Sequence, residues 1–208
     1  MSEIRTHTVY TDGACPGNGT EDATGGMGFA RLNPLNGKYD TKGILWGLHL
    51  TKRYGPPTNQ KCELFAAMVV LASAAMSSLQ KTGYNWSSPM YDKDGTVLEL
   101  IVIKSDSKYV VDGINHWLHN WKRNDWKNSK KKTISNLEMW KDLDQMLSYE
   151  HLRGCFSFSH VSGHSGDPGN DAADLAASLG ANNELSHEFG VGEWEEYLST
   201  ISGCSKLS

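Results

Sequence analysis

The sequence predicts one α/β domain built on a mixed five-stranded sheet with helices on both faces. Three short runs of β-branched and aromatic residues open the chain, separated by turn signals, which is typical of antiparallel strands. Two later strand-like runs alternate with segments of helical period, and a helix that crosses between strands implies parallel pairing. The sheet is therefore expected to begin antiparallel and to continue parallel.

The antiparallel part is predicted from the first fifty residues. Its three strands are expected over Ile4–Thr11, Met27–Leu32 and Ile44–Leu50. The first strand runs into Asp12-Gly13, which favours a turn, and Asn36-Gly37 is a turn signal between the second and third strands. Together these segments predict an antiparallel meander.

A change of hydrophobic period marks the first helix. Apolar residues recur at spacings of three and four, which predicts a helix from about Asn59 to about Lys81, ended by Gly83. The polar segment Tyr84–Gly95 is then expected to be a surface loop.

The second half of the chain adds two strands and four helices. The apolar run Val97–Lys104 is expected to be a strand buried on both faces, and Phe156–Val161 is the fifth strand. The helices are predicted from Tyr109 to about Asn120, from the capping-box signature Ser135-Asn136-Leu137-Glu138 to about Tyr149, from Asp167-Pro168 to about Leu179, and over Gly190–Ile201.

Size and composition exclude several classes of protein. A chain of 208 residues with 38% hydrophobic and 21% charged residues is too apolar to be disordered and has the size of one domain. No run of 18 apolar residues exists, so we expect no membrane span. The cysteines are scattered without a CxxC pair, and no apolar signal segment precedes the first strand, which predicts reduced thiols in an intracellular protein.

Charge is unevenly distributed. The net charge of −4 argues against a general nucleic-acid binder, but six of the eleven residues from Lys122 to Lys132 are basic, and only Asp125 is acidic. Basic side chains beside aromatic rings suit a nucleic-acid backbone, and the alternative is a solvated face above core tryptophans. The tryptophans that interleave with the basic stretch or flank it are Trp117, Trp121, Trp126 and Trp140.

Acidic residues stand at the ends of predicted strands and near the starts of predicted helices. Asp12 closes the first strand, Asp106 follows the buried fourth strand, and Glu63 lies near the start of the long helix. Each acid alone fits a turn or a helix dipole, but clustered carboxylates need a compensating cation, Mg²⁺ above all. A fourth acid is Asp171 or Asp174, and the spacing alone leaves both open.

Two further observations bear on this cluster. Asp174 borders the buried stripe of its helix, where an acid is costly unless a cation compensates it. His164 lies in a glycine-flanked loop, where a flexible histidine near a metal site can move protons. An exposed loop histidine without such a role is the alternative.

Five segments, in order over roughly residues 7–180, match the motifs of one family. They are Tyr10-Thr-Asp12-Gly, Thr58-Asn-Gln-Lys-Cys-Glu63-Leu, Ser105-Asp106-Ser-Lys-Tyr-Val, the stretch from Trp117 to Lys127, and His160-Val-Ser-Gly-His164-Ser-Gly followed by Asn170-Asp-Ala-Ala-Asp174-Leu-Ala. The chain resembles type 1 ribonuclease H, cellular and retroviral. The resemblance implies the ribonuclease H fold and endonucleolytic hydrolysis of the RNA strand of an RNA–DNA hybrid, leaving 5′-phosphate and 3′-hydroxyl ends.

The resemblance also implies roles for individual residues. Two Mg²⁺ ions, with Mn²⁺ as an alternative, are implied at Asp12, Glu63, Asp106 and Asp174, with His164 as the loop histidine. Asn136 and Thr58 match positions that hold a DNA-strand phosphate, and the stretch 117–132 resembles a basic protrusion that grips the DNA strand. The implied nucleic-acid contacts are Asn18, Thr58, Asn59, Gln60, Ser107, Trp117, Trp121, Lys122, Lys127, Lys130, Lys131, Lys132 and Asn136.

Some features depart from the family pattern. Asp125 stands where glycine is usual, Lys108 replaces an uncharged polar residue, and Tyr84–Gly95 is an apparent insertion. We expect a catalytic domain over residues 1–180 and an acidic C-terminal extension over 181–208. No separate N-terminal hybrid-binding domain is expected, which favours a free-standing enzyme over a fragment of a reverse transcriptase. We also expect a monomer.

Two other functions share this pattern. One is a catalytically dead hybrid-binding domain on the same fold, but such a domain is expected to lack at least one of the four acids. The other is a strand-transfer enzyme of the transposase or integrase kind, which does not need the protrusion of tryptophan and lysine. Metal-dependent release of short RNA without a joining product separates the three.

Overall fold

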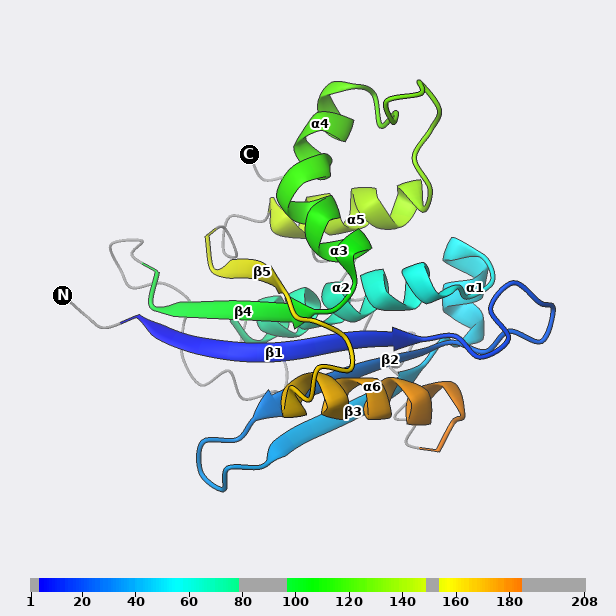
Figure 1. Ribbon diagram of the computed structural model, residues 1–208. Helices are drawn as coiled ribbons and strands as arrows, with labels where there is room; N and C mark the ends of the chain where they lie inside the picture. Colours follow the sequence, from blue (N-terminus) through cyan, green and yellow to red (C-terminus); the bar gives the residue numbers. More distant parts are fainter. Residues whose placement is uncertain (1–3, 79–96, 149–153, 185–208) are drawn as a thin grey trace.

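The computed structural model describes residues 4–78, 97–148 and 154–184 and confirms the mixed five-stranded sheet (Figure 1). The strand order is β3-β2-β1-β4-β5. The β1–β2 and β2–β3 pairs are antiparallel, whereas β1–β4 and β4–β5 are parallel, as the sequence predicts. The strands are β1 (Arg5–Ala14), β2 (Gly26–Leu32), β3 (Tyr39–Leu45), β4 (Glu99–Ser105) and β5 (Phe156–His160).

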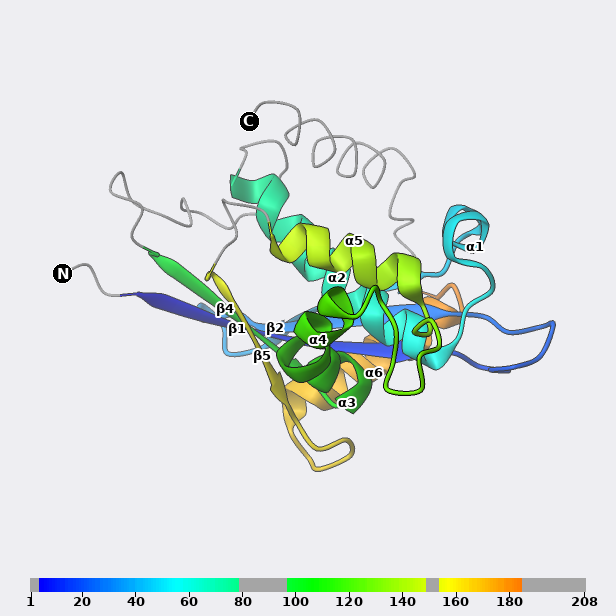
Figure 2. The same ribbon diagram turned by 90° about the horizontal axis from the view of Figure 1, so that it is seen from above.

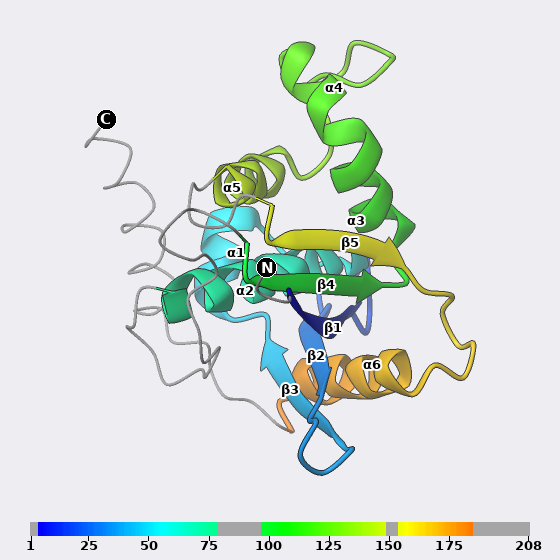
Figure 3. The ribbon, with the colours of Figure 1, turned by 90° about the vertical axis from the view of Figure 1, so that its left-hand side faces the viewer.

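Helices cover both faces of the sheet. The segments are α1 (Leu48–Tyr54), α2 (Asn59–Ser78), α3 (Lys108–Asp112), η1 (Gly113–Trp117), α4 (Leu118–Arg123), α5 (Leu137–Leu147) and α6 (Pro168–Ala181). The helix α6 packs on β1, β2 and β3 from one side, while α2 packs on the other side (Figure 3). The helix α5 lies along α2, so α2 is enclosed between the sheet and α5 (Figure 2).

Composition explains how closely α6 approaches the sheet. A Cβ at Gly28 would lie 2.0 Å from the carbonyl oxygen of Ala173, and one at Gly43 would lie 2.4 Å from that of Ala176. Only glycine on the strands and small residues on the helix allow this contact. The acids carried by α6 are thereby held near the sheet.

The third strand is displaced from its predicted position. The turn at Asn36-Gly37 is confirmed, with Gly37 at φ 69°, and it places Tyr39 opposite Leu32. Pairing therefore begins at residue 39, on an edge strand whose first residues are largely polar and which an apolar pattern does not reveal. The prediction of a strand over Ile44–Leu50 was wrong beyond residue 45, because residues 48–54 form α1.

Three other predictions need correction. The helix predicted from Tyr109 is divided by a π-helical turn, η1, at Gly113, where a Cβ would lie 2.2 Å from the ring of Trp140. The capping box is wrong, because Asn136 rather than Ser135 holds the N-cap position of α5, at φ 56° and without a side-chain capping bond. Burial along β4 alternates, so its second face is only partly covered.

The helix at Asp167-Pro168 is confirmed, with the Asp167 side chain capping α6. In the described ranges, no helix has both the length and the apolarity needed to cross a membrane. Several predictions lie outside the described residues: the helix end near Gly83, the loop Tyr84–Gly95, the helix over Gly190–Ile201 and most of the acidic segment 181–208.

Candidate active site

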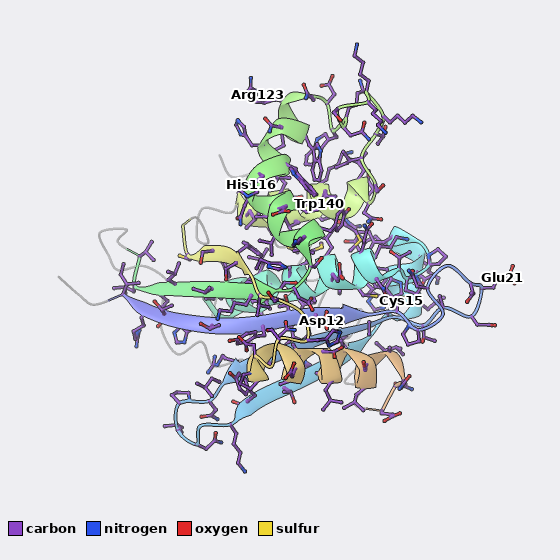
Figure 4. The ribbon with its side chains drawn as sticks, in the orientation of Figure 1. Asp12, Cys15, Glu21, His116, Arg123 and Trp140 are labelled. Carbon is purple, nitrogen blue, oxygen red and sulfur yellow. The ribbon has the colours of Figure 1, made fainter. Side chains whose placement is uncertain are left out.

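Four carboxylates approach one another where β1 and β4 end. Asp12 lies on β1, Asp106 directly follows β4, Glu63 lies in the second turn of α2, and Asp174 lies in the second turn of α6. The parallel pairing of β1 with β4 brings the carboxyl ends of both strands to the same edge. Asp12 lies between β4 and α6 (Figure 4), and the charges of the other three acids all act on it. The structure thus brings together the four acids predicted as a set.

Burial and neighbouring charge determine the state of Asp12. The residue is 8% exposed, and this burial is the largest cause that raises the pKa of its carboxyl to about 7. Negative charge on Asp106, and then on Asp174 and Glu63, raises this pKa further. The backbone N–H of Gly13 donates to Asp12 Oδ1 at 2.7 Å and opposes the rise.

Glu63 is held beside Asp12 by packing and by one hydrogen bond. A Cβ at Gly13 would lie 2.2 Å from the backbone nitrogen of Glu63, so glycine there lets α2 contact β1. The Ser107 hydroxyl donates to Glu63 Oε2 at 2.5 Å. Burial raises the pKa of Glu63, the Ser107 bond lowers it, and the charge of Asp106 raises it again.

Asp174, rather than Asp171, belongs electrostatically to this group. Asp174 is half-buried and its charge acts on Asp12, whereas Asp171 is exposed in the first turn of α6. The loop residue His164 is exposed, at φ 52°. Its side chain makes no hydrogen bond or ion pair with the four acids in the part of the chain that the structure describes.

The donor chemistry and the charge of this site fit a hard divalent cation. Its four acids offer carboxylate oxygens, which are the ligands that such a cation prefers, and burial followed by mutual repulsion raises the pKa of Asp12. Among residues 4–78, 97–148 and 154–184, no three histidine, cysteine, aspartate or glutamate side chains are arranged to share one ion.

Without metal, the stability of the protein is expected to fall as the pH rises from about 4 towards 7. The pKa of Asp12 is raised from 3.8 to about 7 in the folded state. A carboxyl with a raised pKa stabilises the fold while protonated, and this contribution, on the order of a few kcal/mol, is lost as the pH passes through the folded-state pKa. Melting temperatures in a chelator across this window test the expectation, and an Asp12→Asn variant with the same slope would contradict it.

The basic stretch forms a projection above the sheet (Figure 1). Its indole rings lie in a row. The ring centroids of Trp117 and Trp121 are 5.6 Å apart, and those of Trp121 and Trp140 are 5.1 Å apart. Trp117 is 39% exposed and Trp140 is fully buried, so the row of rings runs from the protein surface into the hydrophobic core. Trp140 is therefore a core residue, whereas a nucleic-acid contact of Trp117 stays a prediction.

A loop held by Asn128 presents the last three lysines. Asn128 Oδ1 accepts hydrogen bonds from the backbone N–H groups of Lys130 at 2.9 Å and Lys132 at 3.1 Å. Lys131, between them, has φ 58°, and all three lysines are exposed. Lys122, in contrast, is paired with Asp144 at 2.8 Å. The loop thus offers three exposed positive charges to a ligand.

Known proteins that resemble this chain match it across the whole of this site. A family model described as RNase H matches residues 5–182, which include all four carboxylates and the projection. The chain belongs to the RNase H family. It is accordingly a hydrolase that acts on RNA.

RNase H relatives match over nearly their whole length. A ribonuclease H of Enterobacter sp. (strain 638) is 34% identical over 182 residues, which are 88% of this chain and 93% of the relative. A ribonuclease H of Alcanivorax borkumensis is 34% identical over 184 residues, 88% of this chain and 95% of the relative. The crystal structure of LC9-RNase H1, at 23% identity and a TM-score of 0.57, shares the fold over 96% of this chain and 85% of its own.

The RNase H residues predicted to contact nucleic acid fall into two groups. Asn18, Asn59 and Gln60 are exposed, whereas Ser107 is 6% exposed and engaged with Glu63. Asn136 Nδ2 donates to the Tyr109 hydroxyl at 3.1 Å, and Thr58 Oγ1 accepts from the backbone N–H of Lys61 at 3.3 Å. The exposed group can meet a ligand directly, and the others are held in the protein framework.

The backbone explains one departure from the RNase H pattern and leaves another unexplained. Asp125 has φ 49°, in the left-handed region that glycine adopts without strain and aspartate tolerates. Nothing in the structure explains Lys108, which is exposed at the start of α3.

Sequence reasoning missed Asn170. The residue stands within the motif that ends in Asp174-Leu-Ala, but no role was predicted for it. Asn170 is 2% exposed in the first turn of α6, and its Nδ2 lies 3.5 Å from Asp106 Oδ2. A polar residue at the start of a helix usually signals only capping, so the sequence offers no stronger signal.

Proposed function

We propose that this chain is an endonuclease that cleaves the RNA strand of RNA–DNA hybrids. The observation that carries the proposal is the meeting of four carboxylates at the ends of β1 and β4, within the region that the RNase H family model matches. Solved structures with this fold include LC11-RNase H1 in complex with an RNA/DNA hybrid, at 16% identity and a TM-score of 0.53 over 86% of this chain and 99% of its own.

Asp12, Glu63, Asp106 and Asp174 would hold the metal, as two Mg²⁺ ions or Mn²⁺ in their place. When bound, such ions activate a water for in-line attack on the scissile phosphate and stabilise the leaving 3′ oxygen, which gives 5′-phosphate and 3′-hydroxyl ends. Asp12 is central, since the charges of the other three acids act on it. The Ser107 hydroxyl holds Glu63 in place through its hydrogen bond.

The hybrid would lie across the carboxylates with its DNA strand towards the projection. Exposed Asn18, Asn59 and Gln60 would contact the hybrid beside the reacting RNA, and Thr58 with Asn136 would hold a DNA phosphate. Reading 2′-hydroxyls on one strand while accepting deoxyribose on the other is what distinguishes a hybrid from either homoduplex. The contacts assigned to the projection are Trp117, Trp121, Lys122, Lys127, Lys130, Lys131 and Lys132.

We also propose a monomer that works inside the cell, with a catalytic domain to about residue 180 and an acidic extension over 181–208. The buried thiols of Cys15 and Cys62 form no disulfide, which supports a reducing setting.

A cleavage assay tests the function. A labelled RNA–DNA hybrid, incubated with the chain and Mg²⁺, should release short RNA, while single-stranded RNA and double-stranded DNA stay intact. Hybrid binding without cleavage would favour the catalytically dead alternative. A joined product would favour strand transfer.

Replacing His164 with alanine is expected to slow turnover by roughly 10²-fold or less, because a proton-transfer group contributes about 10²–10⁴-fold and bound metals supply most of the chemistry. The exposure of His164 fits a mobile proton carrier. Turnover at saturating hybrid and Mg²⁺ measures this. A loss as complete as that of an Asp106→Asn variant would instead identify His164 as a ligand.

Replacing Lys130, Lys131 and Lys132 together with alanine is expected to weaken hybrid binding. Each lost duplex phosphate contact makes the log–log salt dependence of the binding constant shallower by about 0.9. The rate at saturating hybrid should barely change, because the loop lies on the projection, away from the carboxylates (Figure 4). Binding titrations at several salt concentrations check this, and an unchanged slope would show that the loop is only a solvated surface.

A further inference from the structure

Asn170 is buried next to the carboxylates with only part of its hydrogen-bonding capacity used. The residue is 2% exposed. Its Nδ2 donates to Asp106 Oδ2 at 3.5 Å, which is long for a hydrogen bond. Its Oδ1 is buried and has no hydrogen-bond partner among the described residues. Such an acceptor costs free energy, so its presence calls for an explanation.

The backbone of Asn170 is fixed by contacts that lead back to β1. Asp167 caps α6, its Oδ1 accepting from the N–H of Gly169 at 3.0 Å and from that of Asn170 at 3.4 Å. The Tyr10 hydroxyl donates to Asp167 Oδ2 at 3.3 Å. A Cβ at Gly169 would lie 2.2 Å from the Tyr10 ring, so the first turn of α6 rests directly on that ring. The position of Asn170 is therefore set by β1.

The carboxylate that Asn170 faces is confined from a second side. A Cβ at Gly163 would lie 2.7 Å from Asp106 Oδ2, so the loop before α6 packs against this oxygen. Asp106 itself follows the last residue of β4, and its backbone oxygen lies 3.2 Å from Nε2 of His160, at the end of β5. The amide of Asn170 and the backbone at Gly163 thus restrain one oxygen of Asp106, which leaves the other for a ligand.

We propose that Asn170 is a positioning residue that orients Asp106 for cation binding. A series of hydrogen bonds links Tyr10 to Asp167, Asp167 to the backbone of Asn170, and the Asn170 side chain to Asp106 Oδ2. The proposal rests on the proposed function, because it takes Asp106 as a metal ligand. In proteins, a group that orients a metal ligand by a hydrogen bond typically changes metal affinity by about 10–100-fold when removed.

Two variants and a control test the proposal. Asn170→Ala removes the amide, and Asn170→Leu removes it while keeping a side chain branched at Cγ, so that the site stays filled if the smaller alanine disturbs the fold. Asn182→Ala is the matched control, since Asn182 is exposed at the other end of α6. Mg²⁺ is titrated against the melting temperature without nucleic acid, and kcat and KM for a hybrid are measured at each Mg²⁺ concentration.

Both Asn170 variants are expected to need about tenfold more Mg²⁺ for half of the melting-temperature shift. They should lower kcat at limiting Mg²⁺ and leave KM for the hybrid unchanged. Without metal, Asn170→Leu should melt higher than the parent chain, because the unpartnered Oδ1 is gone. A merely structural residue would instead lower the metal-free melting temperature and leave the Mg²⁺ midpoint in place.

The outcomes separate this inference from the proposed function. If the parent chain does not cleave a hybrid with Mg²⁺, the proposed function fails. If the parent cleaves and the Mg²⁺ midpoints of both Asn170 variants equal those of the parent and of Asn182→Ala, the positioning role alone is overturned.

Discussion

Replacing Asp106 with asparagine is expected to abolish cleavage of an RNA–DNA hybrid while hybrid affinity stays within a few-fold of the parent. The amide keeps the size of the side chain but loses the negative charge, and a neutral amide is a poor partner for a pair of divalent cations. Affinity should persist because the projection, which carries Lys130, Lys131 and Lys132, extends away from the strand ends where Asp12 lies and where Asp106 follows β4 (Figure 4).

Turnover and equilibrium binding on one hybrid measure this result. The binding assay also serves as the control for folding, because a misfolded variant would lose both properties. Substantial residual turnover in Mg²⁺ would contradict the assignment of Asp106 as a metal ligand. A joint loss of turnover and affinity would mean that Asp106 supports the fold of the hybrid-binding surface.

Asp174→Asn is expected to lower Mg²⁺-dependent turnover far more than Asp171→Asn. Asp174 is half-buried and its charge raises the pKa of Asp12, whereas Asp171 is exposed in the first turn of α6. The same variant should raise the melting temperature without metal, because it removes one of the charges that repel Asp12. Asp171→Asn should instead cost a few tenths of a kcal/mol at most, by removing a charge from the positive end of the helix dipole.

The two variants form a matched pair, since each replaces one acid of the same helix by its amide. Turnover and melting temperature are measured for both, with and without Mg²⁺. Equal kinetic effects, or a larger effect at Asp171, would show that the fourth ligand is wrongly assigned. Failure of Asp174→Asn to melt higher without metal would show that its charge is compensated within the protein.

The local sequence pattern was enough to predict those helices whose start is fixed by residues close to them along the chain. The helix after Asp167-Pro168 is confirmed because a side-chain cap and a proline with fixed φ are local devices. The long helix begins at Asn59 as predicted, and its apolar residues are buried on nearly every side between the sheet and α5. In both cases the driving interactions lie within a few residues or follow one clear period.

The sequence pattern failed to predict the elements whose position depends on contacts with residues far away along the chain. The strand β3 is polar along its outer part, and its position follows from pairing with β2 after the turn at Gly37. The π-helical turn η1 begins at Gly113, against which the Trp140 ring packs from another helix. Neither contact leaves a periodic trace in the sequence.

The sequence by itself determined the change from antiparallel to parallel pairing, the set of acids Asp12, Glu63 and Asp106, and a choice of two for the fourth, because each of these depends on residue type and local position. Only the tertiary structure decided which acid of α6 is coupled to Asp12, that Ser107 holds Glu63, and that Asn170 faces Asp106. Those relations join segments 44 and 64 residues apart or more, and the distance between such groups is set by how closely α2 and α6 pack on the sheet.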